Sequence, residues 1–301
     1  MPVCLLASVW LLRVQIDTVR LFMMGWSPDF IRQTQGAEKM AGEITRIALP
    51  GAAGRMGKMI RDLVAEKAEF EIAALTEHSD HPLVGSTTDG VFLSADADVL
   101  GIGKGGVIVD FTRPEATLMH IETARKTGTA MVIGTTGFTN EQEKVLYRAA
   151  GDTPIVYCAN TSVGVTLLAQ IVRQVAGQLG QDWDIEIVET HHNQKIDAPS
   201  GTALALGRAA ADGRNVNLDE VRDSGRDGVT GQRRKGDIGF AVMRGGDVAG
   251  EHTVTFFGQQ ERIDLTHRAV SRAIFARGAL HAAAFASVNP PGLYSMDDVL
   301  A

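Results

Sequence analysis

The sequence lacks most of the features that mark secreted, membrane-spanning or nucleic-acid-binding proteins. Its 301 residues include only two cysteines, Cys4 and Cys158, whose separation matches no metal-binding or redox motif. Acidic residues outnumber basic ones by 36 to 29, and the net charge of −7 argues against a nucleic-acid partner, which needs a basic surface. The apolar run at residues 3–12 is too short to span a bilayer, and no basic segment precedes it as in a secretory signal. We therefore expect a cytoplasmic protein with no membrane partner.

Residues 1–39 are expected to stand apart from the folded chain. Met40 directly precedes residues 41–45, where we expect the ordered domain to begin. Our preferred hypothesis is that residues 1–39 are an upstream extension from a misassigned start codon, and the alternative is an uncleaved targeting peptide. The intact mass of the protein from its native cells distinguishes the two.

The folded region opens with a strand, a glycine-rich turn, a helix and a second strand. The strands are predicted at residues 44–49 and 71–75, and the helix at residues 58–67. The glycines of the turn follow the spacing G-x-x-G-x-x-G over residues 51–57, whereas the usual dinucleotide fingerprint is G-x-G-x-x-G. Glu77 lies 20 residues after Gly57, near the place of a ribose-binding carboxylate. This context favours dinucleotide binding over an ordinary tight turn.

Alternation of strands and helices continues to about residue 161. Strands are predicted at 107–111, 131–133 and 155–158, with helices at 115–126 and 141–150 between them. This order predicts an α/β fold with a doubly wound parallel sheet, in which ligands bind at the carboxyl ends of the strands.

The pattern changes after residue 162. An amphipathic helix covers residues 165–175, and strands are predicted at 183–188, 238–244, 251–257 and 262–267 with no helices between the last three. We expect a second, α+β domain with an antiparallel or mixed sheet. An alanine-rich helix at 273–286 is predicted to return to the first domain. The expected domains are therefore 40–161 with 272–301, and 162–271.

The chemistry is concentrated in the loop that follows the strand at residues 183–188. His191 and His192 are neighbours at a strand end, so their side chains should point to opposite sides. No third ligand stands at a spacing that completes a metal site, so we expect no metal. A strand-end histidine is usually only a hydrogen-bonding residue, but with Lys195 beside it, it can bind a carboxylate and transfer a proton.

A helix is expected to begin directly after this loop. Ser200 is a plausible N-cap, and the backbone N–H groups of Gly201 and Thr202 with the Thr202 hydroxyl could hold a carboxylate. The simpler interpretation is a plain capped helix, and the adjacent His191 and Lys195 favour the anion site.

Five segments together resemble 4-hydroxy-tetrahydrodipicolinate reductase, also called dihydrodipicolinate reductase, from lysine and diaminopimelate biosynthesis. They are Gly-Ala-Ala-Gly-Arg-Met-Gly at 51–57, Asp-Phe-Thr-Arg-Pro-Glu at 110–115, Ile-Gly-Thr-Thr-Gly-Phe at 133–138, Ser-Val-Gly-Val at 162–165, and the long loop Glu-Thr-His-His-Asn-Gln-Lys-Ile-Asp-Ala-Pro-Ser-Gly-Thr-Ala at 189–203. The resemblance extends from Ile44 to the C-terminus.

This resemblance implies a Rossmann-type domain, a substrate-binding and tetramerisation domain, and hydride transfer from NADH or NADPH to a cyclic dicarboxylate with loss of water. It makes His191 and Lys195 catalytic in proton transfer, and His192, Gly201 and Thr202 substrate-binding residues. The cofactor-binding residues that it implies are Gly51, Ala52, Ala53, Gly54, Arg55, Met56, Glu77, Gly134, Thr135, Thr136, Cys158, Ala159, Asn160 and Thr161. The implied assembly is a homotetramer.

Three positions depart from the family pattern. Thr161 stands where the family commonly has phenylalanine, so packing near the nicotinamide should differ. His78 follows Glu77 where some members have an arginine for a 2′-phosphate, so the preference between NADH and NADPH is open. The segment between residues 90 and 107 is also shorter than usual.

Two other functions fit parts of the sequence. One is a Rossmann oxidoreductase with another substrate, such as an aspartate-semialdehyde or amino-acid dehydrogenase, although Cys158 is poorly placed for a nucleophile. The other is a nucleotide-sensing regulator without chemistry, against which the presence of both His191 and Lys195 argues.

Overall fold

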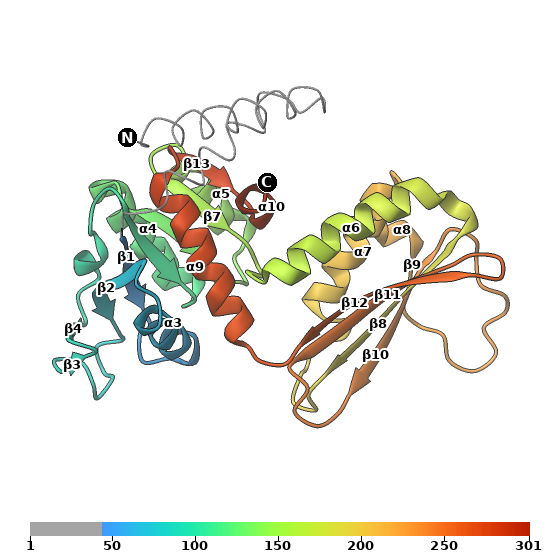
Figure 1. Ribbon diagram of the computed structural model, residues 1–301, viewed down its shortest axis with the longest axis horizontal. Helices are drawn as coiled ribbons and strands as arrows, with labels where there is room; N and C mark the ends of the chain where they lie inside the picture. Colours follow the sequence, from blue (N-terminus) through green and yellow to red (C-terminus); the bar gives the residue numbers. More distant parts are fainter. Residues whose placement is uncertain (1–43) are drawn as a thin grey trace, which may run out of the picture. The chain divides into compact units, whose positions relative to one another are not determined.

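The computed structural model describes residues 44–301, so the expectations for residues 1–39 and for Cys4 lie outside the described part. Residues Thr45–Ala301 contain two sheets, each with helices of its own (Figure 1). Within this range, no helix combines the length and the apolar character needed to cross a membrane.

The first sheet has the strand order β13-β7-β6-β5-β1-β2-β4-β3. All neighbouring strands are parallel except β3, which runs antiparallel to β4. The strands are β1 (Thr45–Pro50), β2 (Phe70–Thr76), β3 (Thr87–Thr88), β4 (Val91–Ser94), β5 (Gly106–Asp110), β6 (Ala130–Ile133), β7 (Pro154–Tyr157) and β13 (Gly292–Tyr294). The predicted doubly wound α/β sheet is confirmed.

Helices cover both faces of this sheet, which explains why every residue of β5 and β6 is buried. On one face, Ile47 and Leu49 pack with α3 (Arg55–Ala65) and α9 (Ala273–Val288). On the other face, Ala48 belongs to the core formed with α4 (Pro114–Thr127) and α5 (Asn140–Ala149). Alternate residues of β1 thus pack in the two cores on opposite faces of the sheet, as the two-residue period of a strand requires.

The sequence pattern missed the short elements of this region. These are β3, β4, β13, the 3₁₀ helix η1 (Ala97–Leu100) and α10 (Met296–Val299), all of which have four residues or fewer. Such lengths are too short to establish a period. Helix α3 also begins at Arg55 rather than at residue 58, because Gly54 already has the extended conformation of an N-cap.

The second sheet has the strand order β12-β11-β8-β10-β9. It is mixed, because β8 pairs in parallel with β10 and antiparallel with β11. The strands are β8 (Asp184–His191), β9 (Arg222–Asp223), β10 (Ile238–Arg244), β11 (Gly250–Phe257) and β12 (Arg262–Ala269). The helices are α6 (Val163–Leu179), η2 (Gly180–Asp182), α7 (Gly201–Gly213) and α8 (Leu218–Val221).

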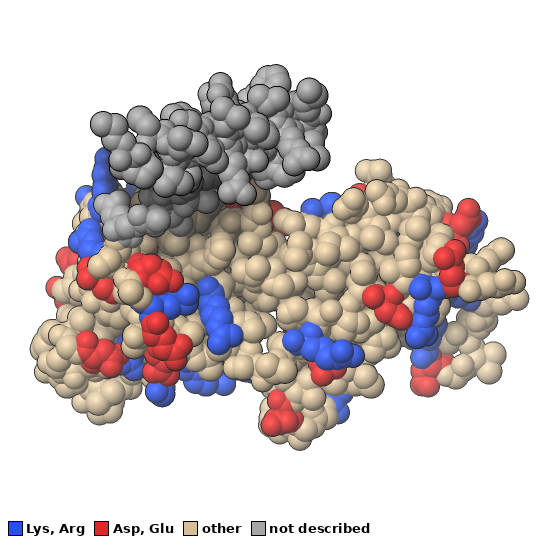
Figure 2. Space-filling view, viewed as in Figure 1, with Lys and Arg blue, Asp and Glu red and all other residues tan. Residues whose placement is uncertain are grey.

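Helices α6 and α7 cover one face of the second sheet and form its apolar core with β8, β10 and β11 (Figure 1). Strand β8 alternates strictly between buried and half-buried residues, because only one of its faces meets this core. On its other face, Arg233 from the loop after β9 binds Asp184 at 2.8 Å and Glu186 at 2.9 Å. On the side of the molecule in Figure 2, acidic and basic side chains are interspersed.

Candidate active site

The turn between β1 and α3 has a geometry that could receive an anion. Gly51 has a φ of +65°, a left-handed conformation that favours glycine. A side chain at Gly57 would overlap the backbone oxygens of Gly51 and Ala52, so the first turn of α3 packs directly on the loop. No side chain caps the N-terminus of α3, and its first turn has no acidic residue. The N–H groups at this helix start are therefore available to a phosphate, and the turn fits a nucleotide pyrophosphate.

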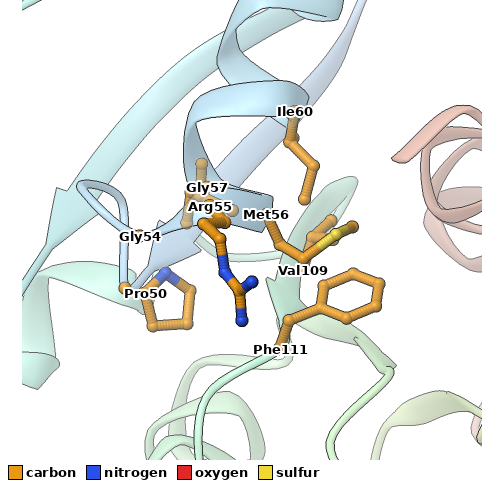
Figure 3. Close-up of a pocket in the computed structure, with 10 residues that line it drawn as sticks. Pro50, Gly54, Arg55, Met56, Gly57, Ile60, Val109 and Phe111 are labelled. Carbon is orange, nitrogen blue, oxygen red and sulfur yellow. The ribbon is translucent and has the colours of Figure 1, made fainter. Parts of the chain in front are cut away.

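This turn lies where the order of the sheet reverses. Strand β1 is flanked by β2 and β5, and ligands of such sheets bind outside the carboxyl ends of the strands at this point. A cavity of about 180 Å³ lies there, lined by the glycine turn together with Val109 and Phe111. The Arg55 side chain extends from the start of α3 past Pro50 toward Phe111 (Figure 3).

A larger cavity of about 950 Å³ adjoins the same turn and reaches the end of β2. Glu77 and His78 line it, together with Arg55 and Arg113. The Glu77 carboxylate accepts a hydrogen bond from the Ala53 backbone N–H at 3.0 Å and another from the His78 N–H at 3.0 Å. Glu77 is thus held at the glycine turn, where a ribose hydroxyl could reach it.

The predicted residues on β6 and β7 are also at carboxyl ends of strands, but their side chains differ in access. Thr135 is buried and hydrogen-bonds to Thr117 at 3.0 Å, next to Asp110. Burial raises the pKa of the Cys158 thiol to about 12, which leaves it protonated and unsuited to act as a nucleophile. Thr161 is buried and donates its hydroxyl to the Phe275 carbonyl at 2.7 Å, so it connects β7 to α9.

His191 is held by a buried carboxylate two residues earlier on the same strand. Because side chains two residues apart share a face, Glu189 and His191 both point toward the core from β8. His191 Nδ1 lies 2.6 Å from Glu189 Oε2, which fixes one ring nitrogen of the histidine. Burial lowers the pKa of His191, and the positive charges of Lys195 and Arg244 lower it further, against the raising effect of Glu189. The imidazole is therefore neutral near pH 7.

The other predicted loop residues have polar partners of their own. His192 directly follows the last residue of β8, and its Nε2 lies 3.2 Å from an Arg272 guanidinium nitrogen before α9. The Lys195 ammonium binds Asp197 Oδ1 at 2.7 Å, and this hydrogen bond holds the pKa of Asp197 below its usual value. The loop therefore contains the counter-ion of Lys195, the Asp197 carboxylate.

The start of α7 connects the two halves of the molecule. Ser200 is the N-cap, and its hydroxyl accepts a hydrogen bond from the Ala203 N–H at 3.1 Å, as predicted. Thr202 Oγ1 accepts a hydrogen bond from Asn160 Nδ2 at 3.0 Å, so the start of α7 meets the carboxyl end of β7. Gly201, between them, is exposed.

Three residues of this site were missed by the sequence reasoning. They are Glu189, Arg244 and His252. Glu189 could have been found from the two-residue period of the strand that ends at His191. Arg244 and His252 carry no local signal, because only the pairing of β10 and β11 with β8 brings them there. Among the described residues, no three His, Cys, Asp or Glu side chains are grouped so that they could hold a metal ion.

We expect the protein to lose stability in mild acid because of the buried His252. Its ring lies 5.1 Å from that of His191, and its Nε2 shares a hydrogen bond with the Ser200 hydroxyl at 3.1 Å. Burial lowers the pKa of His252 from 6.5 to about 4, so the unfolded chain takes up a proton between these values and the folded chain does not. We expect this group to remove about 2 kcal/mol of unfolding free energy between pH 7 and pH 5.

Urea unfolding at both pH values measures this loss. In His252→Gln the pH-dependent loss should shrink by that amount, because glutamine does not titrate. Equal pH dependence in the two proteins would show that His252 is not the responsible group.

Two family models together match nearly all of the described chain. Residues 45–161 match the family model "Dihydrodipicolinate reductase, N-terminus", and residues 164–300 match "Dihydrodipicolinate reductase, C-terminus".

Relatives of similar length carry the corresponding enzyme name. A protein of Rhodopseudomonas palustris named 4-hydroxy-tetrahydrodipicolinate reductase is 51% identical over 263 residues, which cover 85% of this chain and 97% of the relative. A protein of the same name from Roseobacter denitrificans is 47% identical over 263 residues, covering 85% of this chain and 96% of the relative.

Solved structures share the fold at lower identity. A dipicolinate-bound dihydrodipicolinate reductase from Paenisporosarcina sp. TG-14 has a TM-score of 0.67 at 21% identity, covering 84% of this chain and 97% of that one. An amine dehydrogenase from Mycobacterium smegmatis has a TM-score of 0.56 at 12% identity, covering 86% and 96%.

Proposed function

The chain belongs to the dihydrodipicolinate reductase family, and from this we propose that it reduces 4-hydroxy-tetrahydrodipicolinate to tetrahydrodipicolinate. In the balanced reaction the substrate gains one hydride and one proton and loses one water. A bound nicotinamide nucleotide would supply the hydride.

The observation that carries this proposal is the hydrogen bond between Asn160 and Thr202. It joins the strand ends of the nucleotide-type sheet to the helix start beside His191 and Lys195. An enzyme that transfers hydride between a nucleotide and a second substrate needs this adjacency, because the reacting atoms must come within about 3–3.5 Å. A nucleotide-sensing regulator has no use for proton-transfer groups at that place.

Each group of residues has a role in this proposal, and Lys195 has two. The glycine turn, Glu77 and the ends of β6 and β7 hold the nucleotide. Lys195 and the N–H groups at the start of α7 hold the two carboxylates of the substrate, with His192 beside them. Neutral His191 exchanges a proton through its Nε2, and the Lys195 ammonium is a proton donor.

Turnover of 4-hydroxy-tetrahydrodipicolinate, generated in the assay by its synthase, tests this proposal. We expect oxidation of NADH or NADPH that depends on the synthase product. Oxidation of neither nucleotide, by a protein shown to be folded, would contradict the proposed reaction.

We further propose that NADH is the preferred nucleotide. The Glu77 carboxylate suits a ribose 2′-hydroxyl and repels a 2′-phosphate. His78 is exposed, and its Nδ1 accepts a hydrogen bond from the Asp80 N–H at 3.3 Å, so this nitrogen is already used within the loop. Arg55 and Arg113 line the same cavity, which leaves NADPH as a second, weaker substrate.

Glu77→Gln is expected to shift this preference toward NADPH. Removing the charge relieves the repulsion of the 2′-phosphate, and we expect the ratio of kcat/KM for NADPH over NADH to rise about tenfold, or ~1.4 kcal/mol. Glu71→Gln is the matched control, because Glu71 is an exposed glutamate near the start of β2, the strand that leads to Glu77. An unchanged ratio in Glu77→Gln would show that Glu77 stabilises the glycine turn but does not select the nucleotide.

Family membership also leads us to propose a homotetramer in the cytoplasm. Apolar side chains are exposed on the second sheet, among them Met243 at 53%, Phe257 at 39% and Ile263 at 36%, as expected of a surface that another subunit covers. Light scattering should give four times the chain mass, and a monomer would contradict the proposal.

A further inference from the structure

Glu189 is a fully buried carboxylate in the middle of the site. Its relative exposure is 0%, although it carries a charge whose removal from water costs several kcal/mol unless it is fully paired. Hydrogen bonds offset this cost. Burial alone would raise the pKa of Glu189, but the bonds from Arg244, His191 and the Ser200 backbone hold the pKa below its usual value.

The partners of Glu189 come from three different elements. Arg244, at the end of β10, binds both carboxylate oxygens, at 2.8 Å and 2.9 Å. The Ser200 N–H, at the start of α7, donates to Oε1 at 2.9 Å, and His191 Nδ1 contacts Oε2 at 2.6 Å. Because Arg244 binds both oxygens, it fixes the plane of the Glu189 carboxylate. Each oxygen can then accept one further hydrogen bond, Oε2 from His191 and Oε1 from the Ser200 N–H.

This arrangement determines the proton state of His191. An ionised carboxylate can only accept, so Nδ1 carries the hydrogen and Nε2 is the nitrogen that exchanges a proton. The same carboxylate holds the residue that caps α7, so one group sets the relative position of the proton-transfer residue and the helix start.

We propose that Glu189 is the positioning residue of this enzyme, which fixes the Nδ1–H tautomer of His191 and its position relative to the start of α7. The inference rests on the proposed function, in which His191 transfers the proton and the start of α7 holds the substrate. Glu189 itself touches no reacting atom and acts through His191.

The charged and titratable groups around His191 predict the direction of its response. Glu189 on β8 favours the protonated imidazole, whereas Lys195 in the loop and Arg244 on β10 disfavour it, and His252 faces it from β11. In Glu189→Gln the two cations remain and the carboxylate charge is lost. The pKa of His191 should therefore fall, and the limb of the pH–rate profile that reports its protonation should move to lower pH.

NMR of the imidazole nitrogens in Glu189→Gln tests the proposal independently of turnover. A glutamine can turn its amide to donate to Nδ1, so we expect a mixture of tautomers, a lowered pKa of His191, and a kcat reduced about 10- to 100-fold. Glu186→Gln is the matched control, because Glu186 lies on the same strand and also binds arginine, but on the opposite face. It should keep the tautomer, the pKa and the pH–rate profile.

A second variant covers the case in which Glu189→Gln fails to fold. Glu189→Gln combined with Arg244→Gln removes both charges of the pair, so no unpaired buried charge remains. The proposal is overturned if His191 keeps a single Nδ1–H tautomer in either folded variant, or if neither variant folds, which would assign Glu189 to stability. Absence of turnover in the unmodified protein would instead contradict the proposed function, while the NMR comparison would still decide the role of Glu189.

Discussion

Replacing Lys195 by alanine is expected to lower kcat by about 10²- to 10⁴-fold, the usual contribution of a positioned proton-transfer group. The dissociation constant for NADH should stay within about twofold of the unmodified protein, because Lys195 lies in the loop after β8 and not at the glycine turn. Folding should be nearly unaffected, since the pair of Lys195 with the half-exposed Asp197 contributes about 0.2–1 kcal/mol at most. Steady-state kinetics and nucleotide titration measure the two effects separately.

Lys144→Ala is the control for this substitution. Lys144 also pairs with a nearby carboxylate, Glu141 at 2.7 Å, but on the exposed surface of α5. It should change neither kcat nor nucleotide affinity. If Lys195→Ala lost only nucleotide affinity and kept its kcat, the proton-transfer role of Lys195 would be wrong.

Replacing Gly57 by alanine should weaken nucleotide binding about 100-fold. The added methyl group would stand 2.7 Å from the Ala52 carbonyl oxygen and closer still to that of Gly51, so the first turn of α3 must move away from the loop. Losing two N–H hydrogen bonds to a phosphate, at about 1.5 kcal/mol each, gives this factor. The strain should also reduce the unfolding free energy by about 1–3 kcal/mol.

Fluorescence titration with NADH and urea unfolding measure the two losses for Gly57→Ala. Gly225→Ala is the control, because a methyl group at Gly225 meets no atom within 4 Å. Wild-type NADH affinity in Gly57→Ala would show that the start of α3 does not hold the nucleotide.

The first sheet could be predicted from the sequence because its strands are buried on both faces. A strand covered on both sides is a continuous apolar run, and helices separate these runs in regular order. In the second sheet, the alternation that predicted strands at 238–244, 251–257 and 262–267 matches the burial of β11 over residues 250–254. It does not match the burial of β10, whose first three residues are buried and whose last four are not. The order of strands within either sheet has no such local signal, and neither do the two-residue strands β3 and β9.

Only the part of the site that lies in the loop after β8 and at the start of α7 could be predicted from the sequence. His191, Lys195, Ser200 and Thr202 stand within twelve residues, so their chemistry is visible in the sequence. The residues that hydrogen-bond to this part of the site are distant in the sequence. Arg244 binds Glu189, which is 55 residues earlier, and His252 contacts Ser200, which is 52 residues earlier. Thr161 shows the same limit, because its departure from the family pattern was visible but its bond to Phe275, 114 residues away, was not.

Transfer of deuterium from labelled nucleotide tests the central claim most directly. With NADH that carries two deuterium atoms at C4 of the nicotinamide, mass spectrometry of the tetrahydrodipicolinate formed should show one deuterium per molecule, with one nucleotide oxidised for each product. This result would establish direct hydride transfer from the nicotinamide to the substrate, as the proposed reaction requires. Product without deuterium, or nucleotide oxidation without product, would contradict the account.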